Sequence, residues 1–185
     1  MNLDLTHPAK LADADLGRVL CDVAVAVDGK DAGTITLEFW PDAAPGTIRN
    51  FLRYAAEGFY DGKGFHRVIS GFMIQGGCPL GTGTGSGPHG KIRGEFSRKK
   101  EHAHKRGVIS MARSADPHSA SCQFFICHGE AAFLDGQYAA FGRVLTGEKA
   151  LDAVACVPCG AAGGEKSRPT KKCTITGMRL RSKEQ

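Results

Sequence analysis

FHRVISGFMIQGG, residues 65–77, is the most informative stretch of this chain. Two short apolar runs rich in β-branched and aromatic residues flank Ser70-Gly71, a dipeptide typical of a tight turn. The stretch therefore predicts a β-hairpin. Arg67 belongs to the first run and Gln75 to the second, so antiparallel pairing brings both side chains to one side of the sheet.

Similar short β-like runs recur on both sides of this hairpin, separated by glycines and prolines. Asp28-Gly29 begins the turn between the first two runs. The expected strands lie at residues 18–27, 34–39, 65–69, 72–77, 91–96, 107–112, 122–127, 138–145 and 173–180. These nine candidate ranges indicate a sheet of about eight strands, and eight strands can close into a barrel filled by side chains.

Two helices are expected between these strands. Residues 45–58 place Ile48, Phe51 and Leu52 at helical spacing after Pro45 and before the stop signal Gly58. Residues 148–155 form the second helix. The fold class is mainly β: a closed eight-stranded antiparallel barrel whose ends the two helices cap.

The chain of 185 residues is long enough for one domain, expected over residues 18–185, with residues 1–17 as an N-terminal extension. No apolar run approaches the roughly 18 residues that a membrane span requires. Asp4 stands where a signal peptide is basic, and the seven cysteines are an odd count. We therefore expect a cytoplasmic protein with free thiols and no membrane association.

The net charge of +5 is modest, and two basic runs, residues 98–106 and 166–172, contain no aromatic residues. A nucleic-acid partner is therefore not expected. His102 and His104 lie among lysines and arginines, which disfavour a metal ion, so we expect them to be solvated. The segment GAAGGEKSRP, residues 160–169, is expected to be a flexible loop, and the glycine-rich residues 85–90 a loop between strands.

The stretch FHRVISGFMIQGG, followed by GVISMAR (107–113), CQFFIC (122–127) and FLDGQYAAFGRV (133–144), resembles the cyclophilin family in order and spacing. The resemblance covers about residues 19–180, and AFLDGQYAAFG is more similar to bacterial than to animal members. It implies the same capped barrel and a peptidyl-prolyl cis-trans isomerase activity, which requires no metal or cofactor. The expected partners are proline-containing peptides and unfolded or flexible protein segments, bound by a monomer.

Rotation about a bond preceding proline breaks no covalent bond, so the enzyme needs groups that favour the twisted amide rather than a nucleophile. On twisting, the proline nitrogen regains a lone pair, to which the Arg67 guanidinium can donate a hydrogen bond. The resemblance implies that Gln75 orients Arg67 or contacts the substrate carbonyl. It implies that the pocket for the proline ring is lined by Phe72, Met73, Phe125 and Leu134, and that Ala112 and Arg113 supply backbone contacts. Gln123 and His66 then belong to the same wall, and Phe133 and Tyr138 occupy the rim.

Three rim positions depart from the pattern of many family members. Phe133 stands where a tryptophan is common, which weakens the expected binding of cyclosporin because an indole N–H donor is missing. Tyr138 and Arg113 stand where animal members often have histidine and asparagine. Two other functions stay open: a proline-peptide binding or chaperone module with little turnover, and a thiol redox protein that uses Cys156 and Cys159.

Overall fold

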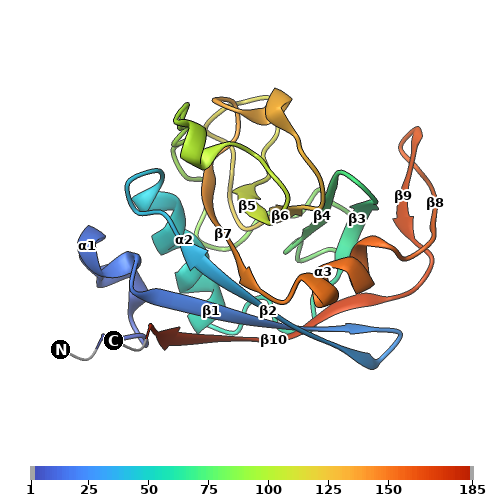
Figure 1. Cartoon of the computed structure of the whole chain (residues 1–185), viewed down its shortest axis with the longest axis horizontal. Helices are drawn as coiled ribbons and strands as arrows, with labels where there is room; N and C mark the ends of the chain where they lie inside the picture. The colour runs from blue at the N-terminus through green and yellow to red at the C-terminus, as the bar shows by residue number, and fades with distance from the viewer. Residues whose placement is uncertain (1–2, 184–185) are drawn as a thin grey trace.

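The computed structural model describes residues 3–183, and eight of its strands form one antiparallel sheet. The strand order is β10-β1-β2-β7-β5-β6-β4-β3, curled into a barrel as Figure 1 shows. These strands are β1 (Val19–Val27), β2 (Lys30–Phe39), β3 (Phe65–Ile69), β4 (Met73–Gly76), β5 (Val108–Met111), β6 (Phe124–Cys127), β7 (Ala140–Thr146) and β10 (Cys173–Ser182). The expected eight-stranded antiparallel barrel is confirmed.

The barrel closes at one place only. Its two edge strands meet where an isolated bridge joins Gly64, just before β3, to Thr174 of β10. Two backbone hydrogen bonds flank the bridge: the Gly62 N–H donates to Ile175 and the Ile175 N–H donates to Lys63, each at 2.8 Å. The closure is therefore local rather than a full ladder between β3 and β10.

The turn between β1 and β2 lies where the sequence predicts it. Asp28 and Gly29 both have positive φ, 50° and 75°, which matches the right-handed twist of the flanking strands. β2 begins directly after this turn, at Lys30, four residues earlier than its apolar alternation suggests. Exposed polar residues extend this strand because the tight turn already brings them beside β1.

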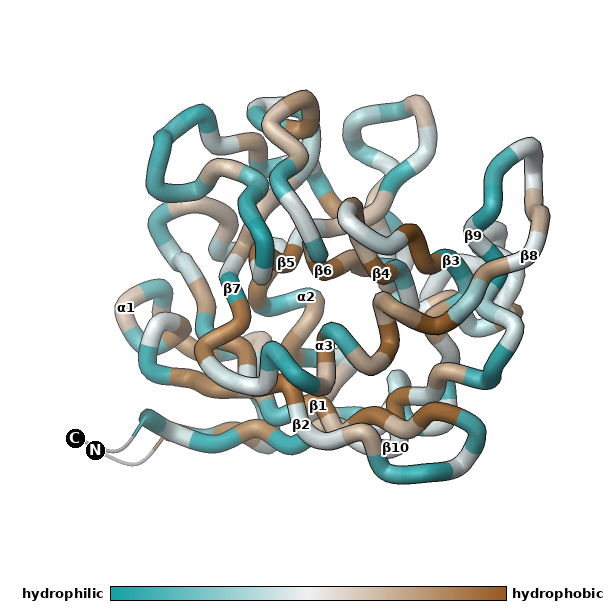
Figure 2. Tube along the Cα trace, turned by 45° about the vertical axis from the view of Figure 1, so that its right-hand side comes forward, coloured by the Kyte–Doolittle hydropathy of each residue, from teal (hydrophilic) through white to brown (hydrophobic). Residues whose placement is uncertain are grey.

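Both expected helices are present. α2 (Pro45–Ala56) starts at its proline and ends before Gly58, and its Ile48, Phe51 and Leu52 are fully buried in the main core. α3 (Glu148–Ala155) covers another part of the barrel, beside β2 and near β3. Figure 2 shows hydrophobic residues gathered on the strands and hydrophilic ones on the outer loops. Among residues 3–183, no helix has the length and apolar character needed to cross a membrane.

The described part of the N-terminal extension packs on the barrel domain. It contains a 3₁₀ turn (η1, Pro8–Lys10) and the short helix α1 (Asp13–Leu16). Leu16 is fully buried in the main core. The Arg49 guanidinium of α2 donates to the Leu11 carbonyl oxygen at 2.8 Å, which ties the extension to that helix.

The strand expected at residues 91–96 is wrong. Only Ile92 pairs, in an isolated bridge with Ala120. Glu95 instead caps the start of α2, where its carboxylate accepts from the backbone N–H groups of Gly46 (3.1 Å) and Thr47 (2.7 Å). An anion at a helix N-terminus is favourable, so this contact draws the segment toward the helix and away from the sheet.

The flexible loop expected at residues 160–169 is also wrong. β8 (Cys159–Ala162) and β9 (Glu165–Pro169) form a two-stranded hairpin that extends from the barrel beside β3. Gly163 and Gly164 make its turn with φ of 57° and 88°, values that suit glycine. The sequence did not predict these strands, because their residues are mostly small or charged and form no apolar run. The hairpin packs against β3 instead.

Candidate active site

The β3–β4 hairpin places the central polar pair of the site. Arg67 on β3 and Gln75 on β4 are direct partners in the antiparallel register. Gln75 also pairs with Phe125 on the next strand, β6. Three neighbouring strands therefore bring a guanidinium, an amide and an aromatic ring together.

These residues line a cavity of about 250 Å³. Its floor and sides are apolar: Met73, Phe125 and Leu134 are buried, and Phe72 and Tyr138 are partly buried. The full lining consists of Arg67, Phe72, Met73, Gln75, Ala112, Arg113, Phe125, Leu134 and Tyr138. A compact hollow with an apolar floor and with Arg67 and Arg113 in its lining suits a small ring such as that of proline.

Three residues assigned to the site from the sequence lie outside this cavity. His66 lines a larger groove of about 790 Å³ on the other side of Arg67. Gln123 lines a third hollow of about 360 Å³, which shares Gln75, Ala112 and Arg113 with the apolar cavity. Phe133 stands on the rim with 64% of its surface exposed, its ring centroid 5.5 Å from that of Phe72.

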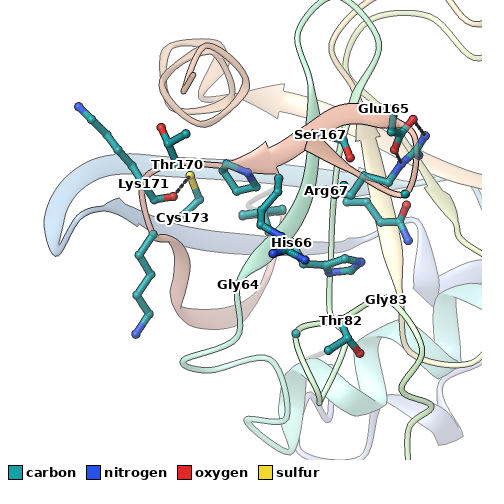
Figure 3. A pocket seen from close by; sticks show the side chains of 18 of the residues that line it. Gly64, His66, Arg67, Thr82, Gly83, Glu165, Ser167, Thr170, Lys171 and Cys173 are labelled. Carbon is teal, nitrogen blue, oxygen red and sulfur yellow. Dashed lines mark hydrogen bonds and ion pairs between the residues drawn. The ribbon is translucent and has the colours of Figure 1, made fainter. Parts of the chain in front are cut away.

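The His66 ring points toward Thr82 and Gly83 in Figure 3. Both of its ring nitrogens are buried and make no hydrogen bond within the described residues. Burial lowers the pKa of His66, and the neighbouring Arg67 charge lowers it further. The ring is thus a neutral wall of the groove near neutral pH.

Arg67 has a partner that sequence reasoning missed. Its Nε donates to Glu165 Oε1 at 2.5 Å and its Nη2 to Glu165 Oε2 at 3.0 Å, as the dashed lines in Figure 3 mark. Glu165 belongs to β9, inside the segment expected to be a flexible loop, so no sequence signal pointed to it. Gln75 Nε2 instead donates to Gln123 Oε1 at 3.1 Å.

A buried polar network lies behind the cavity floor, and it corrects the expectation of solvated histidines. The side chain of His104 is only 1% exposed. Its Nδ1 lies 2.8 Å from Asp135 Oδ1 and its Nε2 lies 3.0 Å from the Ser110 hydroxyl. Because the carboxylate can only accept, Nδ1 donates to Asp135 and Nε2 accepts from Ser110. Ser110 is fully buried, which excludes attack on a substrate.

His102 is buried as well, in a separate contact. Its Nδ1 lies 2.8 Å from the Ser97 hydroxyl, and its ring stacks on Trp40 with the centroids 5.0 Å apart. The two histidines therefore serve packing and hydrogen bonding. The basic surrounding sequence did not reveal this, because Trp40 and Asp135, which contact the two rings, lie far from them along the chain.

The rim beside the cavity is held by Arg113. Its guanidinium lies over the Tyr138 ring, 4.6 Å from the centroid, and its Nε donates to the Gln137 carbonyl oxygen at 3.0 Å. The backbone N–H of Ala112 donates to the Gln123 carbonyl oxygen at 3.0 Å. These contacts fix the side of the cavity formed by the segment after β5.

The cysteine pair lacks the properties of a redox centre. Cys156 is exposed at the end of α3, and Cys159 is partly buried at the start of β8. Burial raises the pKa of Cys159, and its thiol donates to the Val68 carbonyl oxygen at 3.3 Å. Low-pKa thiols need the opposite environment. Among residues 3–183, no group of three or more histidine, cysteine or carboxylate side chains could hold a metal ion.

Comparison with known proteins agrees with this geometry. Residues 23–180 match the family model described as cyclophilin type peptidyl-prolyl cis-trans isomerase/CLD. The chain is 48% identical to peptidyl-prolyl cis-trans isomerase B of Bacillus subtilis over 118 residues, which is 64% of this chain and 80% of that protein. It is 49% identical to the Synechococcus elongatus enzyme over 113 residues, 61% of this chain and 74% of the relative.

The barrel is also similar to a solved structure. A cyclophilin type isomerase of Cryptosporidium parvum, crystallised in the presence of the dipeptide Ala-Pro, superposes with a TM-score of 0.77 at 28% identity. The match covers 88% of this chain and 99% of that one. Family model, relatives and fold agree over the barrel that carries the cavity, and the chain belongs to the cyclophilin-type peptidyl-prolyl cis-trans isomerases, enzymes that rotate the bond before proline.

Proposed function

We propose that Arg67 catalyses this rotation by donating a hydrogen bond to the prolyl nitrogen of the twisted amide. The observation that carries the proposal is the position of its Nη1, 3.8 Å from the sulfur of Met73, a residue that lines the apolar cavity. A proline ring seated on Met73 and Phe125 brings its nitrogen near this edge of the guanidinium. The donor is most effective where the lone pair exists, in the twisted state.

The energy required is within reach of such a site. Amide resonance sets a barrier of about 18–20 kcal/mol. A preference of roughly 7 kcal/mol for the twisted state corresponds to about five orders of magnitude in rate. One charged donor beside a cavity with an apolar floor, together with substrate binding, can supply this preference.

The roles of the other site residues are part of the proposal. Phe72, Met73, Phe125 and Leu134 hold the proline ring. Gln75, bonded to Gln123, faces the same cavity and is available to the substrate carbonyl. Ala112, Arg113, His66, Gln123, Phe133 and Tyr138 contact the residues that flank the proline.

The substrates in this proposal are proline-containing peptides and flexible or unfolded protein segments. The relative crystallised with Ala-Pro supports binding of this class. Cyclosporin binds weakly, because Phe133 offers no N–H donor on the rim. We place the enzyme in the cytoplasm as a monomer, with residues 18–185 as the isomerase domain and 1–17 as an extension, and the seven free cysteines support a reducing compartment.

A protease-coupled assay on a proline peptide tests the mechanism with wild type and Arg67→Ala. We expect kcat/KM to fall by about 10² to 10³, the loss typical of a removed transition-state donor. Arg53→Ala, which removes an exposed guanidinium from α2, is the matched control and retains the wild-type rate. Equal rates for wild type and Arg67→Ala would overturn the mechanism.

The same assay addresses the two other functions considered from the sequence. A pure binding module predicts that Arg67→Ala still binds the peptide and that wild type shows little turnover. A thiol redox function predicts a loss in Cys156→Ser, whereas the isomerase mechanism predicts an unchanged rate. The raised pKa of Cys159 favours the latter outcome.

A further inference from the structure

The carboxylate of Glu165 forms a bidentate ion pair with one edge of the Arg67 guanidinium. Both oxygens take part: Oε1 accepts from Nε at 2.5 Å and Oε2 accepts from Nη2 at 3.0 Å. A two-point contact of this kind fixes the plane of the guanidinium as well as its position. Figure 3 shows the two side chains directed toward each other from β3 and β9.

Glu165 binds the edge of the guanidinium that is remote from the apolar cavity proposed to hold the proline ring (the proline cavity). Glu165 lines the larger groove, whereas Arg67 lines both the groove and the proline cavity. The remaining nitrogen, Nη1, faces the sulfur of Met73 on the cavity side. The ion pair therefore leaves free the N–H groups that a substrate can use.

Glu165 is itself held in place. It begins β9 directly after the Gly163-Gly164 turn, where it pairs with Ala162 of β8. The hydrogen bond from Arg67 lowers the pKa of Glu165, and burial opposes this only in part, so the carboxylate is charged near neutral pH. The hydroxyl of Ser167, a buried residue, also lowers the pKa of Glu165.

The other neighbours of Arg67 do not fix its orientation as firmly. Gln75 donates to Gln123, and the Phe72 ring centroid lies 5.8 Å from the guanidinium carbon. Within residues 3–183, Glu165 is the only carboxylate in an ion pair with Arg67. The family resemblance implies that Gln75 orients Arg67 or contacts the substrate carbonyl. In the structure the carboxylate bonded to Arg67 is that of Glu165, 98 positions away.

We propose that Glu165 is a positioning residue of the isomerase, which holds the Arg67 guanidinium so that Nη1 faces the proline cavity. The inference rests on the role proposed for Arg67. Both partners are partly exposed, 34% and 38% for their side chains, so the pair contributes little to folding stability. Its loss therefore affects the rate more than the fold.

The test compares wild type with Glu165→Gln and Glu165→Ala, and uses Glu101→Gln as a matched change at an exposed site on another segment. We expect kcat to fall about 10-fold in both Glu165 variants, because a misplaced donor mainly costs transition-state stabilisation. KM changes less than 2-fold, and the urea midpoint stays at the wild-type value. Glu101→Gln retains full activity.

A spectroscopic readout reports on the contact directly. In ¹⁵N NMR spectra of the arginine side chains, the Arg67 Nε–H is expected to exchange slowly with water in wild type and rapidly in Glu165→Gln. Arg67→Ala identifies the signal by its disappearance. A purely structural role for Glu165 would not link this exchange rate to kcat.

The outcomes separate the two hypotheses. If Arg67→Ala abolishes catalysis while both Glu165 variants keep the wild-type kcat, the positioning role is wrong and the role of Arg67 stands. A rise in kcat on removing Glu165 also overturns the inference, since the ion pair would then compete with substrate. If Arg67→Ala is fully active, the failure lies in the proposed mechanism itself. Equal activity of Arg67→Ala and the double variant with Glu165→Ala supports the inference, because the carboxylate acts through the arginine.

Discussion

The ring of His104 stacks on the ring of Phe125, with the centroids 6.1 Å apart and the planes inclined by 20°. Phe125 faces the proline cavity, and His104 lies behind it. Hydrogen bonds to Ser110 and Asp135 hold the His104 ring from both sides. A buried polar network therefore supports the apolar floor of the site, and we expect its replacement to affect catalysis as well as stability.

Replacing Phe125 on the cavity floor distinguishes its contribution to core packing from its contribution to substrate binding. Phe125→Ala is expected to lower the free energy of unfolding by about 3 kcal/mol, as for other buried phenylalanines, and to reduce kcat/KM at least 10-fold. Phe124→Ala is the matched control, because Phe124 is the preceding residue of β6 and packs in the main core instead. Urea unfolding and the isomerase assay are the measurements. Equal kcat/KM losses per folded molecule in both variants would contradict a role of Phe125 in the pocket.

Acid is expected to weaken the fold through His104. Burial lowers the pKa of His104 below its ordinary value of 6.5, although Asp135 partly opposes the shift. Well above pH 6.5 neither the folded nor the unfolded state binds the proton, so in that range His104 contributes no pH dependence. As the pH falls through 6.5, only the unfolded state binds it, and stability declines by up to about 1.4 kcal/mol per pH unit.

The measurement for His104 is the free energy of unfolding between pH 8 and pH 5.5. His104→Gln lacks the titrating group, so its curve is expected to be flatter than that of wild type in this window. The difference in the free energy of unfolding between wild type and His104→Gln at pH 8 serves as the control, because at that pH it reflects only the lost packing and hydrogen bonds. Parallel curves for the two proteins would show that His104 is not the responsible group.

Gln123 is expected to hold the glycine-rich loop, residues 81–90, in place beside the site. Its Nε2 donates to the carbonyl oxygens of Gly83 (2.9 Å) and Gly85 (2.8 Å), and its Oε1 accepts from Gln75. Gln123→Ala should accelerate amide hydrogen exchange in residues 81–90 and raise KM about 5-fold, the value of roughly one hydrogen bond. Unchanged exchange in that loop would mean that other contacts hold it.

Phe133 is expected to limit cyclosporin affinity. The side chain is exposed on the rim, where its ring lies tilted against that of Phe72, and it carries no polar group. Phe133→Trp adds an N–H donor at an accessible position, and we expect the Kd for cyclosporin to fall about 5-fold to 10-fold. Calorimetric titration measures this, with proline-peptide turnover as the control for an intact pocket. An unchanged Kd would show that this rim position does not contact the drug.

Local patterns in the sequence were sufficient for most of the barrel. The β3–β4 hairpin follows from two apolar runs around Ser70-Gly71, and α2 from its helical spacing between Pro45 and Gly58. The motifs around Arg67 and Phe125 also identified the family. These features are local because strand and helix periodicity, turn residues and short motifs are all read within about a dozen residues.

Other features depend on which distant segments the barrel brings together. Residues 91–96 leave the sheet because Glu95 caps α2, and His104 is buried because Ser110 and Asp135 satisfy its ring nitrogens. Polar residues give no sequence signal of this kind, since burial becomes favourable only when a partner is present.

The sequence by itself determined the eight strands of the barrel, the helices α2 and α3, the family and the choice of Arg67 as the candidate catalytic residue. Tertiary structure alone decided that the guanidinium is held by Glu165. This residue lies in the β8–β9 hairpin, whose glycines and charged residues are typical of a loop. The physical reason is distance along the chain: 98 residues separate the two side chains, and only the packing of the β8–β9 hairpin beside β3 brings their opposite charges together.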